Sequence, residues 1–109
     1  MAVSSVADVK QHMGNVFNAD KASGVDAVFQ FDLSGTQAEK FWVHVRNGVY
    51  ELGDGEHEEP SITVLADADD YIKIVNGDIQ AMSAFMTGKL KVKGEMGLAL
   101  KLQSIFPTG

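Results

Sequence analysis

Residues 82–106 read MSAFMTGKLKVKGEMGLALKLQSIF, and this stretch decides the fold because its hydrophobic period changes twice. Apolar residues recur at helical spacing over residues 79–86, and Gly88 ends that pattern. Apolar and basic residues then alternate over residues 89–93, which predicts a strand. Helical spacing returns over residues 95–106. The sequence therefore predicts a short helix, a strand and a terminal helix.

The terminal helix is more apolar than packing on a sheet requires. Its apolar arc is wide because one stripe is extended on both sides by Met96, Ala99 and Leu100. Such a helix needs a second apolar contact. Other helices, another subunit or a bound apolar molecule could supply it, and the sequence does not decide among these. The methionines here likewise suit either an ordinary core or an adaptable pocket.

Upstream of this stretch, residues 41–52 predict a β-hairpin. Apolar and polar residues alternate on both sides of Asn47-Gly48, a pair that tolerates the positive φ angles of a type I′ turn. Such a turn fixes the register, so Val45 should face Tyr50. One face of the hairpin should then carry Phe41, Val43, Val45, Tyr50 and Leu52.

The remaining segments complete an α/β domain of the α+β type. An amphipathic helix is predicted over residues 5–18, capped by Ser5 in a capping-box pattern with Asp8. Polar residues fill 18–24 and the loop 53–60. Strands are predicted over 27–33 and 62–66. Asp67 should cap a helix that ends at Gly77.

Composition excludes several classes of protein. The chain has 109 residues and a net charge of −6, so we expect one domain, residues 1–109, that avoids nucleic acid. It contains no cysteine, which excludes disulfides and thiolate metal sites. No apolar run approaches the ~18 residues of a membrane span, and the N-terminus lacks a signal-peptide pattern. We expect a cytoplasmic protein.

The clusters of histidine and acidic residues indicate structural roles and not catalysis or metal binding. Glu56-His57-Glu58-Glu59 lacks the spacing of a helical zinc site and is typical of a solvated loop. Asp67, Asp69 and Asp70 lack the glycine of a calcium loop and suit a helix N-terminus. His12 is expected on the polar side of the first helix, and His44 on the sheet face opposite the core. No motif indicates a catalytic centre or a metal site.

Four lysines form a basic patch in an otherwise acidic chain. They follow the last strand and the terminal helix as Lys89, Lys91, Lys93 and Lys101. Such a strand face can simply resist aggregation. It can also contact anionic lipid headgroups, at roughly 1 kcal/mol per lysine near a membrane surface.

The chain resembles the sterol carrier protein 2 (SCP-2) family. The resemblance rests on Met-x-Ala-Phe-Met-x-Gly-Lys-Leu-x-x-x-Gly, which spans residues 82–94, and on the leucine-rich helix that follows. Segments 28–35, 47–48 and 60–67 also match the family pattern, so the resemblance covers nearly the whole chain. It implies a five-stranded sheet covered on one face by helices that enclose a hydrophobic tunnel. Family members bind sterols, fatty acids, acyl-CoAs or phospholipids without a cofactor and are not themselves enzymes.

The resemblance also implies which residues line the tunnel. The two C-terminal helices offer Met82, Phe85, Met86, Leu98, Leu102 and Ile105, and the sheet offers a floor of Phe29, Phe31, Val43 and Val45. Gln103 could hydrogen-bond a ligand headgroup or simply face solvent.

Two features leave the role of the domain open. The chain ends in Pro107-Thr108-Gly109, so a peroxisomal signal is not expected. Trp42 and His44 on the outer sheet face could bind a partner enzyme, which would make this an accessory domain that presents a lipid-like substrate. Their alternative is partial burial at a dimer interface or under the chain's own N-terminus. The sequence specifies neither the lipid class nor the oligomeric state.

Overall fold

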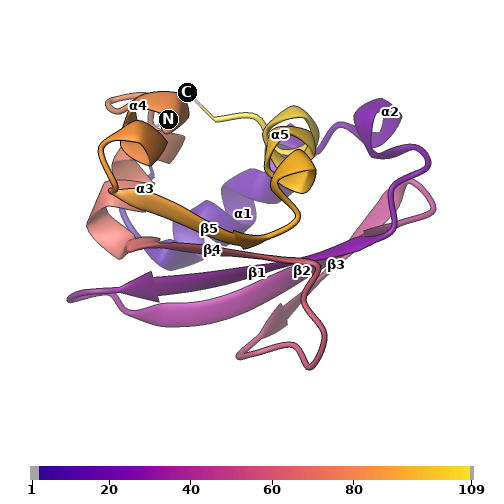
Figure 1. The fold of residues 1–109 in the computed structure, drawn as a ribbon, viewed down its shortest axis with the longest axis horizontal. Coiled ribbons are helices and arrows are strands. Elements are labelled where there is room, and N and C mark those ends of the chain that lie inside the picture. Colours follow the sequence, from indigo (N-terminus) through magenta and orange to yellow (C-terminus); the bar gives the residue numbers. More distant parts are fainter. Residues whose placement is uncertain (1–2, 109) are drawn as a thin grey trace.

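The computed structural model describes residues 3–108, and its helices lie on one side of a five-stranded sheet (Figure 1). The sheet order is β3-β2-β1-β4-β5, with β1 and β4 parallel and the other neighbours antiparallel. The strands are β1 (Ala27–Ser34), β2 (Glu39–Arg46), β3 (Val49–Asp54), β4 (Ile62–Asp67) and β5 (Leu90–Gly94). The predicted α+β class and strand number are confirmed.

Five helices form the covering layer within residues 3–108. They are α1 (Val6–Val16), α2 (Ala19–Ala22), α3 (Ala68–Val75), α4 (Ala81–Met86) and α5 (Met96–Ile105). Helix α2 lies in the segment that was predicted to be only polar. The Asn18 side chain accepts from the Lys21 amide and so caps a single turn that is too short to show a hydrophobic period.

The β2-β3 hairpin has the register that its turn predicts. Val45 pairs with Tyr50, and Arg46 pairs with Val49. Asn47 and Gly48 have φ angles of 55° and 73°, as a type I′ turn requires. The alternation in β2 therefore buries Phe41, Val43 and Val45 on the helix side of the sheet.

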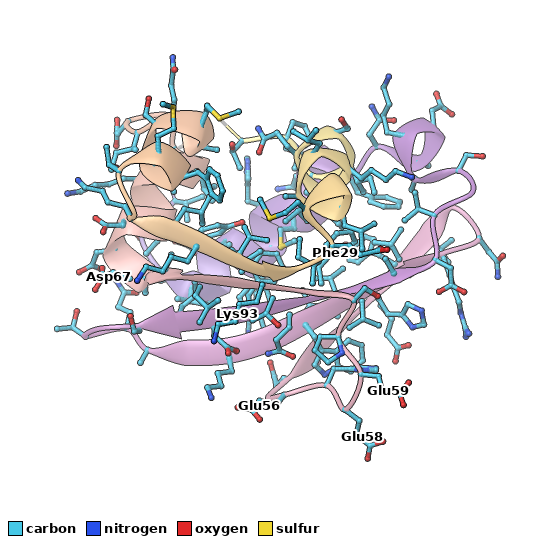
Figure 2. The ribbon with its side chains drawn as sticks, viewed as in Figure 1. Phe29, Glu56, Glu58, Glu59, Asp67 and Lys93 are labelled. Atoms are coloured by element: carbon cyan, nitrogen blue, oxygen red, sulfur yellow. The ribbon has the colours of Figure 1, made fainter. Side chains whose placement is uncertain are left out.

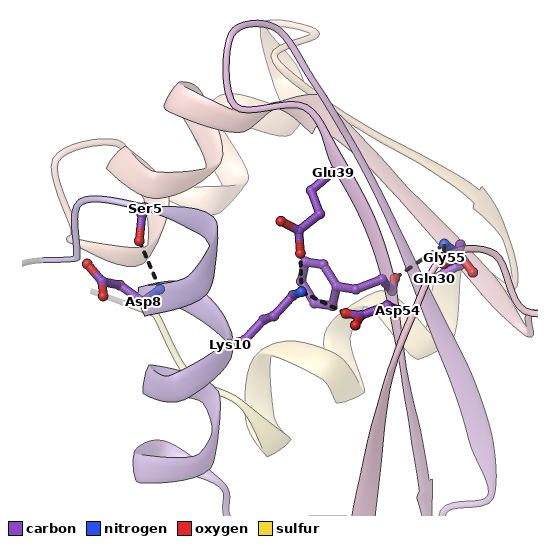
Figure 3. Close-up of polar contacts among 8 residues, drawn as sticks. Ser5, Asp8, Lys10, Gln30, Glu39, Asp54 and Gly55 are labelled. Atoms are coloured by element: carbon purple, nitrogen blue, oxygen red, sulfur yellow. Dashed lines mark hydrogen bonds and ion pairs between the residues drawn. The ribbon is translucent and has the colours of Figure 1, made fainter.

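Two predicted helix caps are present. The Ser5 hydroxyl accepts from the Asp8 amide at 3.1 Å (Figure 3). The Asp8 carboxylate accepts from Ser4 and does not complete a capping box with Ser5. These hydrogen bonds to Ser4 lower the pKa of Asp8. Asp67 accepts from the amides of Asp69 and Asp70 at 2.9 and 3.3 Å. The aspartates at this helix start therefore have the structural role predicted for them.

The sheet's outer face contains a buried polar side chain that the sequence did not reveal. The Gln30 amide donates to the carbonyls of Phe41 and Gly55, and its oxygen accepts from the His57 amide at 2.8 Å. Figure 3 shows Gln30 reaching Gly55 from β1. Gln30 is only 3% exposed. It therefore fixes the β3-β4 loop against the sheet.

Lys10 of α1 lies against the opposite side of the sheet, in a second polar contact. Its ammonium group pairs with Glu39 and with Asp54, and it lies 5.2 Å from the centre of the Phe41 ring (Figure 3). Partial burial opposes the charge, yet the two carboxylates hold the pKa of Lys10 above its ordinary value. This contact ties α1 to β2 and β3.

Candidate functional site

A cavity of about 520 Å³ lies between the helical layer and the β4-β5 edge of the sheet. This volume falls within the ~300–1,000 Å³ typical of small-molecule sites. Helices α1, α3, α4 and α5 line it together with strands β4 and β5 and the C-terminal segment after α5. The wide apolar arc of α5 thus borders a cavity, as it would if its second contact were a bound apolar molecule.

The cavity wall is largely aliphatic and aromatic. Strands β4 and β5 contribute Val64, Leu90 and Val92, whose spacing places them on one face of the sheet. Helix α3 contributes Tyr71, Ile74 and Val75, and α4 and α5 supply further apolar side chains, namely Ala81, Met82, Phe85, Met96, Ala99, Leu100 and Leu102. Such a surface suits an apolar guest.

The position of His12 on α1 differs from the prediction. It lines the cavity beside Val9, Met13 and Val16 and does not lie on the polar side of the helix. The reason is helical geometry, since His12 follows Val9 by three residues and precedes Val16 by four. A histidine at that position shares the apolar stripe whatever its own polarity.

The cavity opens to solvent beside α4 and α5. Met82, Phe85, Met96 and Leu100 all line it, and their exposed fractions are 61%, 41%, 49% and 68%. Large apolar side chains this exposed are uncommon around a sealed core. They form a mouth, and we use that name for these four residues below.

The structure divides the residues that were expected to line the tunnel. Met82, Phe85, Leu102 and Gln103 lie on the cavity wall. The others are not among the lining residues: Phe29, Phe31, Val43, Val45, Met86, Leu98 and Ile105. The four sheet residues face the correct side, but they are buried in the core beneath the helical layer (Figure 1). Figure 2 shows Phe29 within that packed layer.

Met86 and Ile105 are absent from the cavity wall for opposite reasons. Met86 is 79% exposed and lies outside the cavity lining, whereas Ile105 is fully buried. Helical spacing alone cannot separate these outcomes, because it gives the direction of a side chain but not the position of its neighbours.

Polar groups on the wall are few. They are His12, Tyr71, Gln103 and Thr108. The Gln103 amide donates to the Thr108 hydroxyl at 2.9 Å, so these two satisfy one another at the exposed end of the wall. Burial raises the pKa of the Tyr71 hydroxyl far above its ordinary value. Tyr71 therefore stays neutral at physiological pH.

The four lysines of the basic patch are exposed, and two of them, Lys91 and Lys93, lie on the side of β5 that faces away from the cavity. Leu90 and Val92 line the cavity, so alternation turns Lys91 and Lys93 to the other side of β5. Figure 2 shows Lys93 at that strand, on the sheet side of the molecule. Lys89 precedes β5, and Lys101 lies on α5.

The charged loop between β3 and β4 has a structural role, as its contacts with the sheet indicate. Glu58 and Glu59 point into solvent, and Glu56, which is also exposed, pairs with Lys40 of β2 (Figure 2). The ring of His57 contacts Trp42 edge-on at a centroid distance of 5.0 Å. Trp42 is thus partly covered by the chain's own loop, whereas the described part of the chain begins at Val3, which hydrogen-bonds to Asn76. Within residues 3–108 no group of three or more His, Asp or Glu side chains is close enough to hold a metal ion.

None of the helices in residues 3–108 combines the length and apolar character that crossing a bilayer requires.

Comparison with known proteins shows where this architecture recurs. Residues 9–107 match the model of the SCP-2 sterol transfer family. A hydroxysteroid dehydrogenase-like protein 2 from Xenopus tropicalis is 37% identical over 92 residues, which are 84% of this chain and 22% of that protein. The chain therefore spans about a fifth to a quarter of the curated relatives it matches.

Two solved structures share the fold at low sequence identity. Sterol carrier protein-2 from Aedes aegypti, in complex with the C16 fatty acid palmitate, aligns with a TM-score of 0.68 and 18% identity, over 96% of this chain and 97% of that one. A sec-alkylsulfatase from Pseudomonas sp. aligns with a TM-score of 0.75 and 17% identity, over 89% of this chain and 15% of that one. The same fold thus occurs both as most of a small chain and as a minor part of a larger one.

Proposed function

This chain belongs to the SCP-2 sterol transfer family, and we propose that it binds one lipid acyl chain non-covalently in the cavity and transfers it between membranes. The observation that supports this most is the apolar cavity of about 520 Å³ with an exposed apolar mouth. The palmitate complex of the Aedes aegypti protein, which has the same fold, supports an acyl chain as the guest.

The energetics of such binding are favourable. Each CH₂ that the cavity keeps out of water is stabilised by about 0.8 kcal/mol relative to water, so the cavity can offset the loss of the membrane's hydrocarbon when a long chain leaves the bilayer. Loss of translational and rotational freedom opposes this gain, which sets the expected affinity near the micromolar range. A carrier benefits from that balance because it must also release its guest.

The chemistry of the wall supports binding over catalysis. Among the lining residues within 3–108, no carboxylate accompanies His12, and no serine or cysteine is available as a nucleophile. We therefore propose that the domain is not itself an enzyme.

A cavity-filling substitution tests the site. Ala99 lines the cavity, so Ala99→Trp should occupy the space an acyl chain needs and reduce uptake of a fluorescent C16 fatty acid at least tenfold. Ser104→Trp is the matched control because Ser104 lies exposed on the same helix outside the cavity. Equal uptake by both variants, with both folded, would place the guest elsewhere.

We also propose that the mouth contacts the membrane during lipid exchange. Met82, Phe85, Met96 and Leu100 surround the opening, and Met86 adds a further exposed apolar side chain on α4. The lysines of the basic patch remain candidates for contact with anionic headgroups. Two of them, Lys91 and Lys93, project from the side of β5 that faces away from the cavity. The proposed membrane contact therefore rests on the exposed apolar side chains of the mouth and Met86.

Met86 allows membrane contact to be tested apart from lipid binding, since it lies outside the cavity. Met86→Asp should weaken sedimentation with phosphatidylcholine–phosphatidylserine vesicles several-fold and leave fatty acid affinity unchanged. Lys91→Glu is the comparison that tests the basic patch. Vesicle binding that is insensitive to Met86→Asp and lost in Lys91→Glu would assign the contact to the lysines.

An accessory role is the alternative, because the chain spans about a fifth of dehydrogenase-like relatives. In that case the domain would present a lipid-like substrate to a separate catalytic unit. Transfer of a labelled fatty acid between donor and acceptor vesicles by this chain alone distinguishes the two. Rapid transfer supports a carrier, whereas binding without transfer supports the accessory role.

A further inference from the structure

Tyr71 is a buried residue whose hydroxyl has no hydrogen-bond partner within residues 3–108. The side chain is 8% exposed and its ring packs edge-on against Phe31 at 5.8 Å between centroids. No hydrogen bond joins its hydroxyl to another described residue, although every fully enclosed side-chain nitrogen or oxygen in this part of the chain has a partner. The hydroxyl therefore keeps some exposed surface, and the cavity is a space that Tyr71 lines.

His12 is a second unpaired donor on the same wall. The other two histidines have partners, since His44 contacts Asp26 at 2.9 Å and His57 accepts from the Glu59 amide. No such partner for His12 is found among residues 3–108. Both groups can donate a hydrogen bond to a guest. Gln103 and Thr108 are less available because they bond to one another.

Charge on the wall limits what these donors can hold. The lining residues within 3–108 include no lysine, arginine, aspartate or glutamate. A phosphate group carrying several negative charges would have no permanent positive partner, so burying it would be costly. A carboxyl group is smaller, carries at most one charge and accepts hydrogen bonds at two oxygens.

We propose that Tyr71 and His12 form a headgroup site that holds the carboxyl group of a free fatty acid inside the cavity. This inference rests on the proposed function, because it assumes that the cavity binds an acyl chain. It assigns the unesterified acid as the preferred ligand over acyl-CoA. The Tyr71 hydroxyl donates to one carboxyl oxygen, and the His12 imidazole donates to the other or to the same one. Sterols, whose headgroup is one hydroxyl, would use only part of this site.

Carbon-13 NMR of palmitate labelled at its carboxyl carbon tests the assignment directly. We expect a bound resonance with the full wild-type chain that differs in shift from that of palmitate in vesicles. Tyr71→Phe should move this resonance and weaken binding about tenfold, the effect of losing one hydrogen bond to the headgroup. His12→Leu should move it as well. Tyr50→Phe is the matched control because Tyr50 lies outside the cavity lining.

Each outcome has a separate meaning. A bound resonance that neither Tyr71→Phe nor His12→Leu moves would overturn the headgroup site while leaving lipid binding intact. No bound resonance in any protein, together with no uptake of a fluorescent acyl chain, would instead refute the proposed function. Unlabelled palmitate should displace the label, and palmitoyl-CoA at the same concentration should not. Equal displacement by palmitoyl-CoA would overturn the assigned ligand class.

Discussion

Leu102 and Leu98 offer a sharp test of where the guest lies, since they are one helical turn apart on α5. Both are half-buried and pack against the core, but only Leu102 lines the cavity. The family resemblance implies that both line the ligand site, whereas only Leu102 lies on the cavity wall. Leu102→Asp and Leu98→Asp therefore form a matched pair that differs mainly in access to the cavity.

The expected magnitude follows from the carboxylate that Leu102→Asp introduces. With an acyl chain against it, the new side chain must lose water or take up a proton. Raising its pKa from about 3.9 to 7 would cost about 4 kcal/mol. Leu102 keeps partial access to solvent, so roughly half of that cost, about 2 kcal/mol, should appear as lost affinity. This corresponds to about 30-fold weaker binding.

Fluorescent fatty acid titration is the assay, after circular dichroism has shown that both variants are folded at the assay temperature. Leu98→Asp should bind within about twofold of wild type, although both variants should be less stable because each loses apolar packing. Equal loss of affinity in the two variants would show that the effect comes from a loosened helix. Unchanged affinity in Leu102→Asp would remove this wall from the site.

Three further predictions concern stability. Gln30→Leu removes the side chain that bonds to the Phe41 and Gly55 carbonyls and to the His57 amide. The free energy of unfolding, measured with urea, should therefore fall by roughly 1–3 kcal/mol. An unchanged midpoint would contradict the role of Gln30 in holding the loop. Asp67→Ala removes the cap of α3 and should cost about 1 kcal/mol in a thermal melt, whereas no change would mean that water replaces the cap. Because burial raises the pKa of Tyr71 above its ordinary 10.0, the folded chain retains a proton that the unfolded chain releases above that pH. Stability should therefore fall by about 1.4 kcal/mol per pH unit beyond pH 10, and Tyr71→Phe should make this decline shallower; identical profiles would show that Tyr71 is not buried in solution.

Local patterns predicted the sheet well because each signal in it is short-range. The Asn47-Gly48 turn fixes the register of its hairpin, and Asp67 caps the helix it precedes. Helix α2 escaped prediction because one turn held by Asn18 has no periodicity to detect.

The cavity was harder to predict because its wall depends on distances between elements. Phe29 and Val43 face the helical layer as expected, but the core encloses them. Tyr71 shares the apolar stripe of α3 with Ile74 and Val75, and nothing in the sequence shows that its hydroxyl lacks a partner. The position of His12 was available from the sequence, since its spacing to Val9 and Val16 places it on their stripe.

The most direct test of the central claim is native mass spectrometry of the freshly purified protein, followed by denaturing extraction of whatever it holds. We predict a one-to-one adduct in wild type whose extract is a long-chain lipid, and its absence in Ala99→Trp. A wild-type protein that is empty and takes up no fluorescent acyl chain, or an adduct that Ala99→Trp retains in full, would contradict the claim that this cavity is a lipid site.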